Sequence, residues 1–179
     1  MNGRPRNRYL KLALFLGGVI FAGFAVQRLL EMKLSDGLEE AAFTEAGNVE
    51  AELRAGFNEA AAEARVVVLL SAGSLSSEQD VFALRRVLRE DRNAPVRILA
   101  VWRGPKPLRA HTTAFGDGRV RHYWDPEGLV LRGTLEGTVL VHRAGVRWAE
   151  GEAMPAAAES GEPARASIGL VRRAFRGGR

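Results

Sequence analysis

The sequence predicts an α/β domain in which helices flank a mixed sheet, with a membrane-spanning helix ahead of it. Two apolar runs rich in β-branched residues, 66–70 and 96–102, indicate buried strands. Between them, residues 77–91 carry apolar side chains at helical spacing. A strand, a helix of this length and a second strand form a right-handed parallel βαβ unit. Near the N-terminus, residues 12–26 form an uncharged run behind a basic segment.

The first 34 residues have the pattern of an export signal or a signal anchor. The uncharged run follows four basic residues, Arg4, Arg6, Arg8 and Lys11. With flanking leucines it reaches the ~20 residues that a spanning helix needs. The basic flank predicts a single-pass protein of the inner (plasma) membrane, with its C-terminal domain outside the cytoplasm. The alternative is cleavage near Gly23-Phe24-Ala25, which would release a secreted or periplasmic protein.

The basic character of the chain is confined to this N-terminal segment. The formal net charge is +5, and residues 1–34 hold six basic groups and one acidic group. That leaves 20 of the 26 basic and 20 of the 21 acidic groups for residues 35–179. A neutral body argues against a nucleic-acid partner. The chain has no cysteine, which excludes a disulfide framework, thiol catalysis and a cysteine-ligated zinc site.

An acidic amphipathic helix is predicted ahead of the βαβ unit, from about 47 to 64. Its apolar residues Val49, Leu53 and Phe57 recur at helical spacing. Gly47 or Asn48 is placed to begin the helix. We therefore divide the chain into a basic flank and membrane anchor over 1–34, an acidic helix or linker over 35–64, and a folded domain over 65–179.

The sequence after the βαβ unit predicts a β-hairpin, a flexible loop and a closing helix. The hairpin pairs 138–142 with 146–148 around a turn at Gly145, because glycine tolerates turn dihedrals. Residues 150–163, rich in Ala, Glu, Gly and Pro, indicate the loop. The last segment, 164–175, has apolar residues at helical spacing and arginines but no acids. We expect this basic helix to dock near the acidic helix or to contact anionic lipid.

A short serine motif stands between the first predicted strand and the helix. The turn Ser71-Ala72-Gly73 leads into Ser74-Leu75-Ser76-Ser77. This placement resembles the Cys-x-x-Cys motif of thioredoxin-like proteins, where a helix N-terminus lowers the pKa of the attacking thiol. The element order also resembles that fold, whose first two strands are parallel and whose final hairpin adds antiparallel strands. Over about 60–175 the chain is similar to a membrane-anchored bacterial thioredoxin-like protein.

The resemblance implies a thioredoxin-like mixed sheet with a degenerate active site. Ser74 and Ser77 stand at the two cysteine positions, and Gly137 and Thr138 replace the cis-proline that faces the active-site turn. A serine hydroxyl cannot perform thiol–disulfide exchange, so the resemblance implies no redox activity. For both serines we predict helix capping, because no histidine lies near either in the sequence. The region around 71–77 and 136–138 is then a groove available for binding.

A second candidate region follows at 120–126. Tyr123, Trp124 and Asp125 form a candidate binding surface there, and Asp125 is expected to cap the turn that begins at Pro126. Four residues of this part of the chain have side chains that can bind metals: His111, Asp117, His122 and Asp125. Their spacing matches no metal motif, so we expect no metal and no other cofactor.

These observations lead to one functional hypothesis and one alternative. The hypothesis is a non-catalytic binding or assembly module of the cell envelope, tethered to the membrane and acting on an unidentified protein partner. The alternative is an enzyme: either a redox accessory that uses the cysteines of another protein, or a hydrolase or metal-dependent activity near His122 and Asp125.

Overall fold

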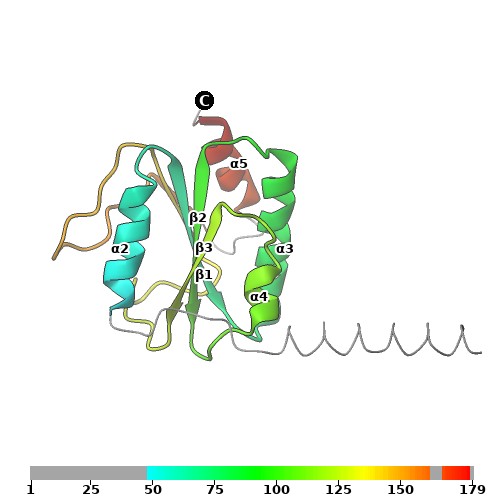
Figure 1. Cartoon of the computed structure of the whole chain (residues 1–179). Coiled ribbons are helices and arrows are strands. Elements are labelled where there is room, and N and C mark those ends of the chain that lie inside the picture. The colour runs from blue at the N-terminus through cyan, green and yellow to red at the C-terminus, as the bar shows by residue number, and fades with distance from the viewer. Residues whose placement is uncertain (1–47, 162–166, 178–179) are drawn as a thin grey trace, which may run out of the picture. The chain divides into compact units, whose positions relative to one another are not determined.

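The structure is a computed structural model that describes residues 48–161 and 167–177. These residues form a mixed five-stranded sheet with helices on both faces, as Figure 1 shows. The strands are β1 (Ala64–Ser71), β2 (Val96–Arg103), β3 (Val120–Asp125), β4 (Val139–His142) and β5 (Glu159–Gly161), and the helices are α2 (Val49–Glu59), α3 (Leu75–Glu90), α4 (Arg109–Thr113) and α5 (Ile168–Gly177). The predicted membrane span lies outside the described residues, and no helix within them is long and apolar enough to cross a membrane.

β1 and β2 are parallel and lie next to each other within the sheet, whose strand order is β3-β2-β1-β4-β5. Ala64 pairs with Val96 and Ser71 with Arg103, so the two strands end at the same edge. Helix α3 connects them, which confirms the predicted βαβ unit. The apolar run of β1 is buried on both sides because helices cover both faces of the sheet.

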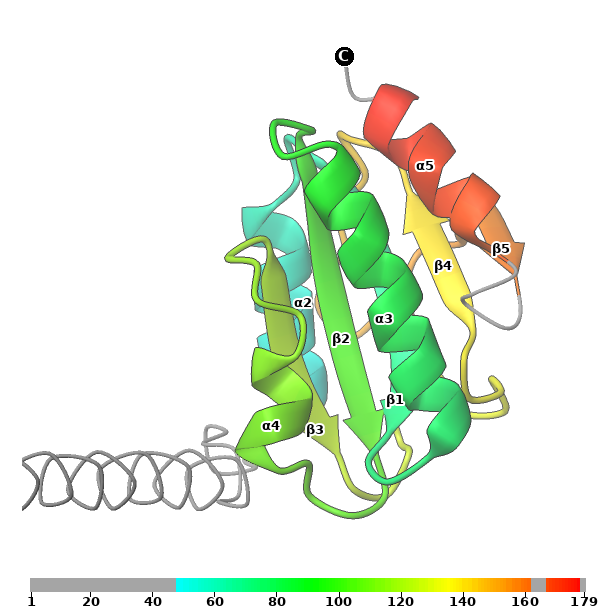
Figure 2. The same cartoon turned by 90° about the vertical axis from the view of Figure 1, so that its right-hand side faces the viewer.

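Helices α3 and α5 cover one face of the sheet and α2 covers the other (Figures 1 and 2). Val66 and Val68 of β1 point into the core beneath α3 and α5, whereas Val67 and Leu69 point toward α2. Leu53 and Phe57 of α2 are fully buried in that second cluster. The boundary predicted at residue 65 therefore separates two elements that pack together, and α2 belongs to the folded domain.

The order and direction of the strands give a thioredoxin-like fold. β4 runs antiparallel to β1, and β5 runs antiparallel to β4. Helix α5 then returns to the face that α3 covers. Strand β3 lies parallel to β2 and extends the sheet at its edge. The predicted mixed sheet with flanking helices is confirmed, while the membrane helix expected before it stays a prediction.

The predicted hairpin is wrong in its second strand. β4 pairs with β5, which comes from the segment predicted as a flexible loop, and the segment before Trp148 forms no strand. The buried guanidinium of Arg65 gives the reason, because it donates hydrogen bonds to the carbonyl of Val146 at 2.7 Å and to that of Arg143. Trp148 instead exchanges two backbone hydrogen bonds of 2.8 Å with the Asn58 side chain of α2.

Helix α5 does not dock near the acidic helix α2, because the two cover opposite faces of the sheet. Its residues Val171 and Phe175 are buried in the α3 face. Two arginines of α5 form ion pairs with acids outside α2: Arg172 pairs with Glu90 at 2.8 Å, and Arg173 pairs with Glu159 at 2.6 Å. The expected pairing of basic and acidic helices is wrong, since burial of apolar side chains fixes the position of α5.

Candidate binding site

The turn from β1 to α3 holds the first serine of the motif at the helix N-terminus. Gly73 has a φ of +77°, a conformation that favours glycine. Ser74 is the N-cap of α3, and its Oγ accepts a hydrogen bond of 3.5 Å from the backbone N–H of Ser77. This confirms the capping predicted for Ser74, and the helix begins at Leu75, two residues before the predicted start.

Ser77 links the turn to a distant glutamate instead of capping the helix. Its side chain is 1% exposed. Its Oγ accepts a hydrogen bond of 2.9 Å from the backbone N–H of Ser71 and donates one of 2.8 Å to Glu136 Oε1. Ser76 Oγ donates to the same oxygen at 3.0 Å and lies 2.9 Å from Ser74 Oγ. Ser74, Ser76, Ser77 and Glu136 thus form one serine–glutamate cluster.

Glu136 adds a negative charge at the N-terminus of α3, where Glu78 lies in the first turn. Burial raises the pKa of the Glu136 carboxyl, but hydrogen bonds from Ser74, Ser77 and Ser76 outweigh burial and hold the pKa below its ordinary value. The carboxylate is therefore ionised at neutral pH, where the helix dipole favours an anion. Within the described residues no histidine hydrogen-bonds to Ser74 or Ser77, and the chain has no cysteine to supply a thiolate there.

Gly137 and Thr138 lie beside β1. The backbone N–H of Gly137 donates to the carbonyl of Leu69 at 2.8 Å, and the N–H of Leu69 donates to the carbonyl of Thr138 at 3.1 Å. Gly137 and Thr138 are both buried. The predicted groove is thus closed on this side, because Glu136 binds directly to the serines of the turn.

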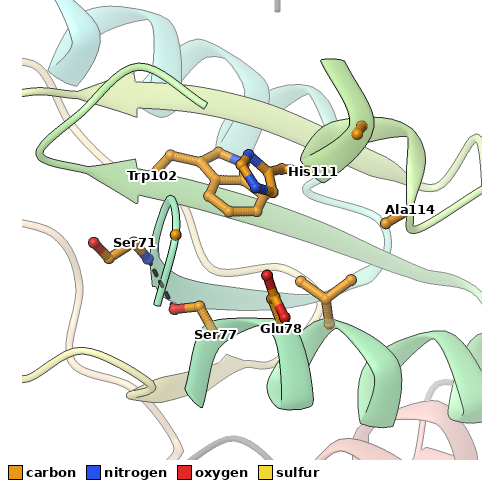
Figure 3. Close-up of a pocket in the computed structure, with 9 residues that line it drawn as sticks. Ser71, Ser77, Glu78, Trp102, His111 and Ala114 are labelled. Carbon is orange, nitrogen blue, oxygen red and sulfur yellow. Dashed lines mark hydrogen bonds between the residues drawn. The ribbon is translucent and has the colours of Figure 1, made fainter. Parts of the chain in front are cut away.

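A cavity of about 320 Å³ opens on the other side of the same turn. It lies between α3 and α4, at the edge where the parallel strands β1 and β2 end, as Figure 3 shows. Ligands of open α/β sheets bind at this edge. Small and apolar side chains make up much of the lining, with polar groups among them: Ser71, Gly73, Ser77, Glu78, Val81, Trp102, Ala110, His111 and Ala114.

Trp102 and His111 lie together in this pocket, with ring centroids 6.0 Å apart (Figure 3). The indole Nε1 of Trp102 donates to Nδ1 of His122 at 3.1 Å. Burial lowers the pKa of His122 to about 4, so this nitrogen is free of a proton and accepts at neutral pH. Nδ1 of His111 accepts from the backbone N–H of Leu108 at 3.0 Å. Because Nδ1 accepts, Nε2 is the ring nitrogen of His111 that can donate to a ligand.

The second predicted region does not form one surface. Successive residues of β3 point to opposite faces of the sheet, so Tyr123 faces α2 and Trp124 faces the other side. Tyr123 and Asp125 are buried, and Trp124 is half-buried. Asp125 accepts two backbone hydrogen bonds of 2.9 Å from the turn that follows it, which confirms its predicted capping role. His122 lies on the face opposite to Asp125, so the two do not combine into one site.

The four residues considered as metal ligands are engaged with other groups. Asp117 pairs with Arg119 at 2.8 Å. His111 and His122 accept hydrogen bonds from Leu108 and Trp102, and Asp125 accepts two from the turn that follows it. Over residues 48–161 and 167–177, no three histidine or acidic side chains lie close enough to share a metal ion.

Sequence reasoning placed the β1–α3 turn in the site and missed most of the pocket wall. Trp102 is the last residue but one of β2, and Ala110 and Ala114 lie in and at the end of α4, a helix too short to give a periodic signal. Glu136 was visible only as the neighbour of Gly137. Its contact with Ser77 spans 59 positions, which no local pattern encodes.

The comparisons with known proteins find similarity among solved structures. No family model and no curated protein matches the sequence. Among solved structures, the chain is similar to a secreted disulfide oxidoreductase of Mycobacterium tuberculosis, described as homologous to DsbE of E. coli. The two are 9% identical with a TM-score of 0.46, and the match covers 69% of this chain and 85% of that chain. The fold described above is assigned on its strand order and directions.

Proposed function

We propose that this protein is a non-catalytic binding module that uses the pocket between α3 and α4. The observation that carries the proposal is the pocket itself, which has largely apolar walls and lies at the sheet edge where α/β folds bind ligands. Beside it, the positions that would hold redox cysteines carry Ser74, which caps α3, and Ser77, which donates to Glu136. The site is therefore built for contact with a ligand, and its hydroxyl groups are held by structural hydrogen bonds.

The size and surroundings of the pocket favour an apolar side chain of a protein partner. A volume of about 320 Å³ is at the lower end of ligand sites, which span ~300–1,000 Å³. Leu75 is 69% exposed and precedes the pocket residue Glu78 by three positions in α3, so an exposed apolar side chain lies on the same side of the helix. An apolar rim favours a macromolecule over a small metabolite. His111 and Glu78 can then bind polar groups of the partner's backbone.

The proposal includes a membrane tether, because residues 12–26 follow a basic flank. With the flank in the cytoplasm, the domain would lie outside it, attached to the inner membrane and available to partners of the cell envelope. A cleaved N-terminus would leave the same domain free in the periplasm or the medium.

Photo-crosslinking in native membranes tests the binding site. A photoreactive phenylalanine analogue replaces Glu78, an exposed residue at the pocket rim, in one version of the full chain. In a second version it replaces Asn93, which is exposed beyond the other end of α3. We expect a discrete protein adduct from position 78 and none from position 93.

A pocket-filling substitution provides the control for specificity. Ala114→Phe places a ring in the pocket and should abolish the adduct from position 78. Ala153→Phe adds the same ring to an exposed loop outside the pocket and should leave the adduct unchanged. Equal adducts from both positions, or an adduct that survives Ala114→Phe in a folded protein, would show that the pocket is not the binding site.

A further inference from the structure

Residues 48–179 carry 20 basic and 16 acidic groups, and this charge is divided unequally between the two faces of the sheet. Helix α2 carries Glu50, Glu52 and Glu59 against the single base Arg54. On the opposite face, the second half of α3 and helix α5 present five arginines around one acid: Arg85, Arg86, Arg89, Arg172 and Arg176, with Glu90. This group has a net charge of +4.

Glu90 joins the arginines of the two helices into one continuous surface. Arg86 Nε lies 3.1 Å from Glu90 Oε1, and Arg172 Nη2 lies 2.8 Å from Glu90 Oε2. Arg85 and Arg89 form no ion pair with any residue that the structure describes. Their positive charges are therefore available to an external anion.

An exposed aromatic ring lies within this basic surface. Phe82 is 71% exposed. It precedes Arg85, Arg86 and Arg89 by three, four and seven positions, so all four lie on one side of α3. These residues and Glu90 line an open hollow of about 470 Å³. We call Phe82 together with the five arginines and Glu90 the arginine face.

We infer that the arginine face binds the surface of a bilayer that contains anionic lipids. Arginines bind phosphate headgroups through charge-assisted hydrogen bonds, and an exposed phenylalanine enters the boundary between headgroups and acyl chains. A nucleic acid would need several aromatic stacking platforms, whereas this face has one exposed ring. The inference uses the membrane anchor of the proposed function, which holds the domain at high local concentration near lipid. It is independent of what occupies the pocket.

A single fluorescent label on the full chain tests this inference. The chain has no cysteine, so Phe82→Cys creates one thiol for the environment-sensitive dye NBD. The labelled protein is reconstituted into vesicles of phosphatidylcholine alone or mixed with phosphatidylglycerol. We expect a blue shift and a rise in dye emission only with phosphatidylglycerol. High salt should reverse both, because it screens charge.

Two matched double substitutions distinguish binding by the arginine face from an effect of the net charge of the domain. Each arginine near an anionic surface changes the binding ratio about fivefold. Arg85→Gln with Arg89→Gln should therefore lower the ratio of lipid-bound to free domain by about 25-fold. Arg143→Gln with Arg147→Gln removes the same charge from an exposed loop that leads to the α2 face, and should leave the ratio unchanged.

Three outcomes would overturn the inference. The first is equal dye emission in both lipid mixtures, and the second is an equal loss in the two double variants. The third is a dye response to single-stranded RNA but not to phosphatidylglycerol, which would assign the face to nucleic acid. Flotation with phosphatidylcholine vesicles keeps failure of the anchor distinct, because an unanchored chain stays behind there, whereas an anchored chain floats even if the arginine face does not bind.

Discussion

Ser77, which the resemblance places at a cysteine position, has a structural role in this domain. Its Oγ accepts from the backbone N–H of Ser71 and donates to Glu136, so it joins β1, the start of α3 and the segment before β4. The sequence identified the position but predicted only capping. The contact with Glu136 depends on the tertiary structure, which a local pattern does not contain.

Substitution of Ser77 by alanine should destabilise the domain. The Ser71 N–H and the Glu136 carboxylate would both lose a hydrogen-bond partner, which costs about 1–3 kcal/mol in the free energy of unfolding. Urea unfolding of the Ser77→Ala variant measures this loss. Ser160→Ala, an exposed residue of the edge strand β5, is the matched control and should cost little. Equal effects of the two substitutions would contradict the role assigned to Ser77.

Cysteines at positions 74 and 77 should form an intramolecular disulfide. Ser74 is the N-cap of α3 and Ser77 lies three residues on, within its first turn. Residues three apart around a helical turn are neighbours, within the ~4.4–6.8 Å between Cα atoms that a disulfide allows. Thiol titration after mild oxidation of Ser74→Cys with Ser77→Cys should find no free thiol, while each single variant keeps one. A double variant that keeps both thiols would argue against the thioredoxin-like geometry of the turn.

His142 should make the stability of the domain depend on pH. Its side chain is 1% exposed, and neither ring nitrogen has a hydrogen-bond partner among the described residues. Burial, together with the charge of Arg65, lowers its pKa to about 4. In the unfolded chain the pKa is about 6.5. As the pH falls from about 6.5 to about 4, the unfolded state gains a proton that the folded state does not, and stability falls by about 3 kcal/mol.

The substitution His142→Phe isolates this effect, because a phenyl ring does not titrate. The variant should lose less stability than the wild type between neutral pH and pH ~4, by about 3 kcal/mol. At neutral pH it should unfold at a similar or higher urea concentration, since a ring without unsatisfied nitrogens replaces the imidazole. The same pH dependence in both proteins would show that His142 is protonated equally in the two states.

At the scale of elements, the βαβ unit was predictable and the second half of the sheet was not. The runs at 66–70 and 96–102 are apolar because both faces of the sheet are covered, and such strands carry a strong local signal. Strand β5 is the polar segment Glu159-Ser160-Gly161, which has no such signal. Val146 and Trp148 alternate like a strand, but Arg65 takes the carbonyl of Val146. Tertiary contacts therefore determine that 159–161 form a strand and that the segment before Trp148 does not.

Helix α5 should be held in place by its apolar face. Phe175 is buried against the α3 side of the sheet, and truncation of a buried phenylalanine to alanine costs about 3–5 kcal/mol. Phe175→Ala should lower the midpoint of urea unfolding accordingly. Arg176→Ala changes the next residue, which is exposed, and should cost less than about 0.5 kcal/mol. A small effect at Phe175 would mean that α5 contributes little to the core.

At the scale of the whole molecule, the candidate site is assembled from segments that are distant in the sequence. The β1–α3 turn, the end of β2 and helix α4 line the pocket, while Glu136 closes the opposite side of the turn. The sequence predicted the first of these because its motif resembles a known one. The others carry common residue types in unremarkable patterns. The acidic and basic helices were visible in the sequence, but their placement on opposite faces of the sheet depends on the tertiary structure.

The most direct test of the central claim is fluorine NMR of the full chain in lipid nanodiscs with fluorinated tryptophan. The chain has three tryptophans: Trp102 lines the pocket, whereas Trp148 lies in the cluster under α2. N-acetyl-leucinamide serves as the probe of an apolar side chain. We predict a saturable shift of the Trp102 signal, no shift of the Trp148 signal, and loss of the response in Ala114→Phe. Equal shifts of both signals, or no shift up to the solubility limit of the probe, would contradict a binding pocket between α3 and α4.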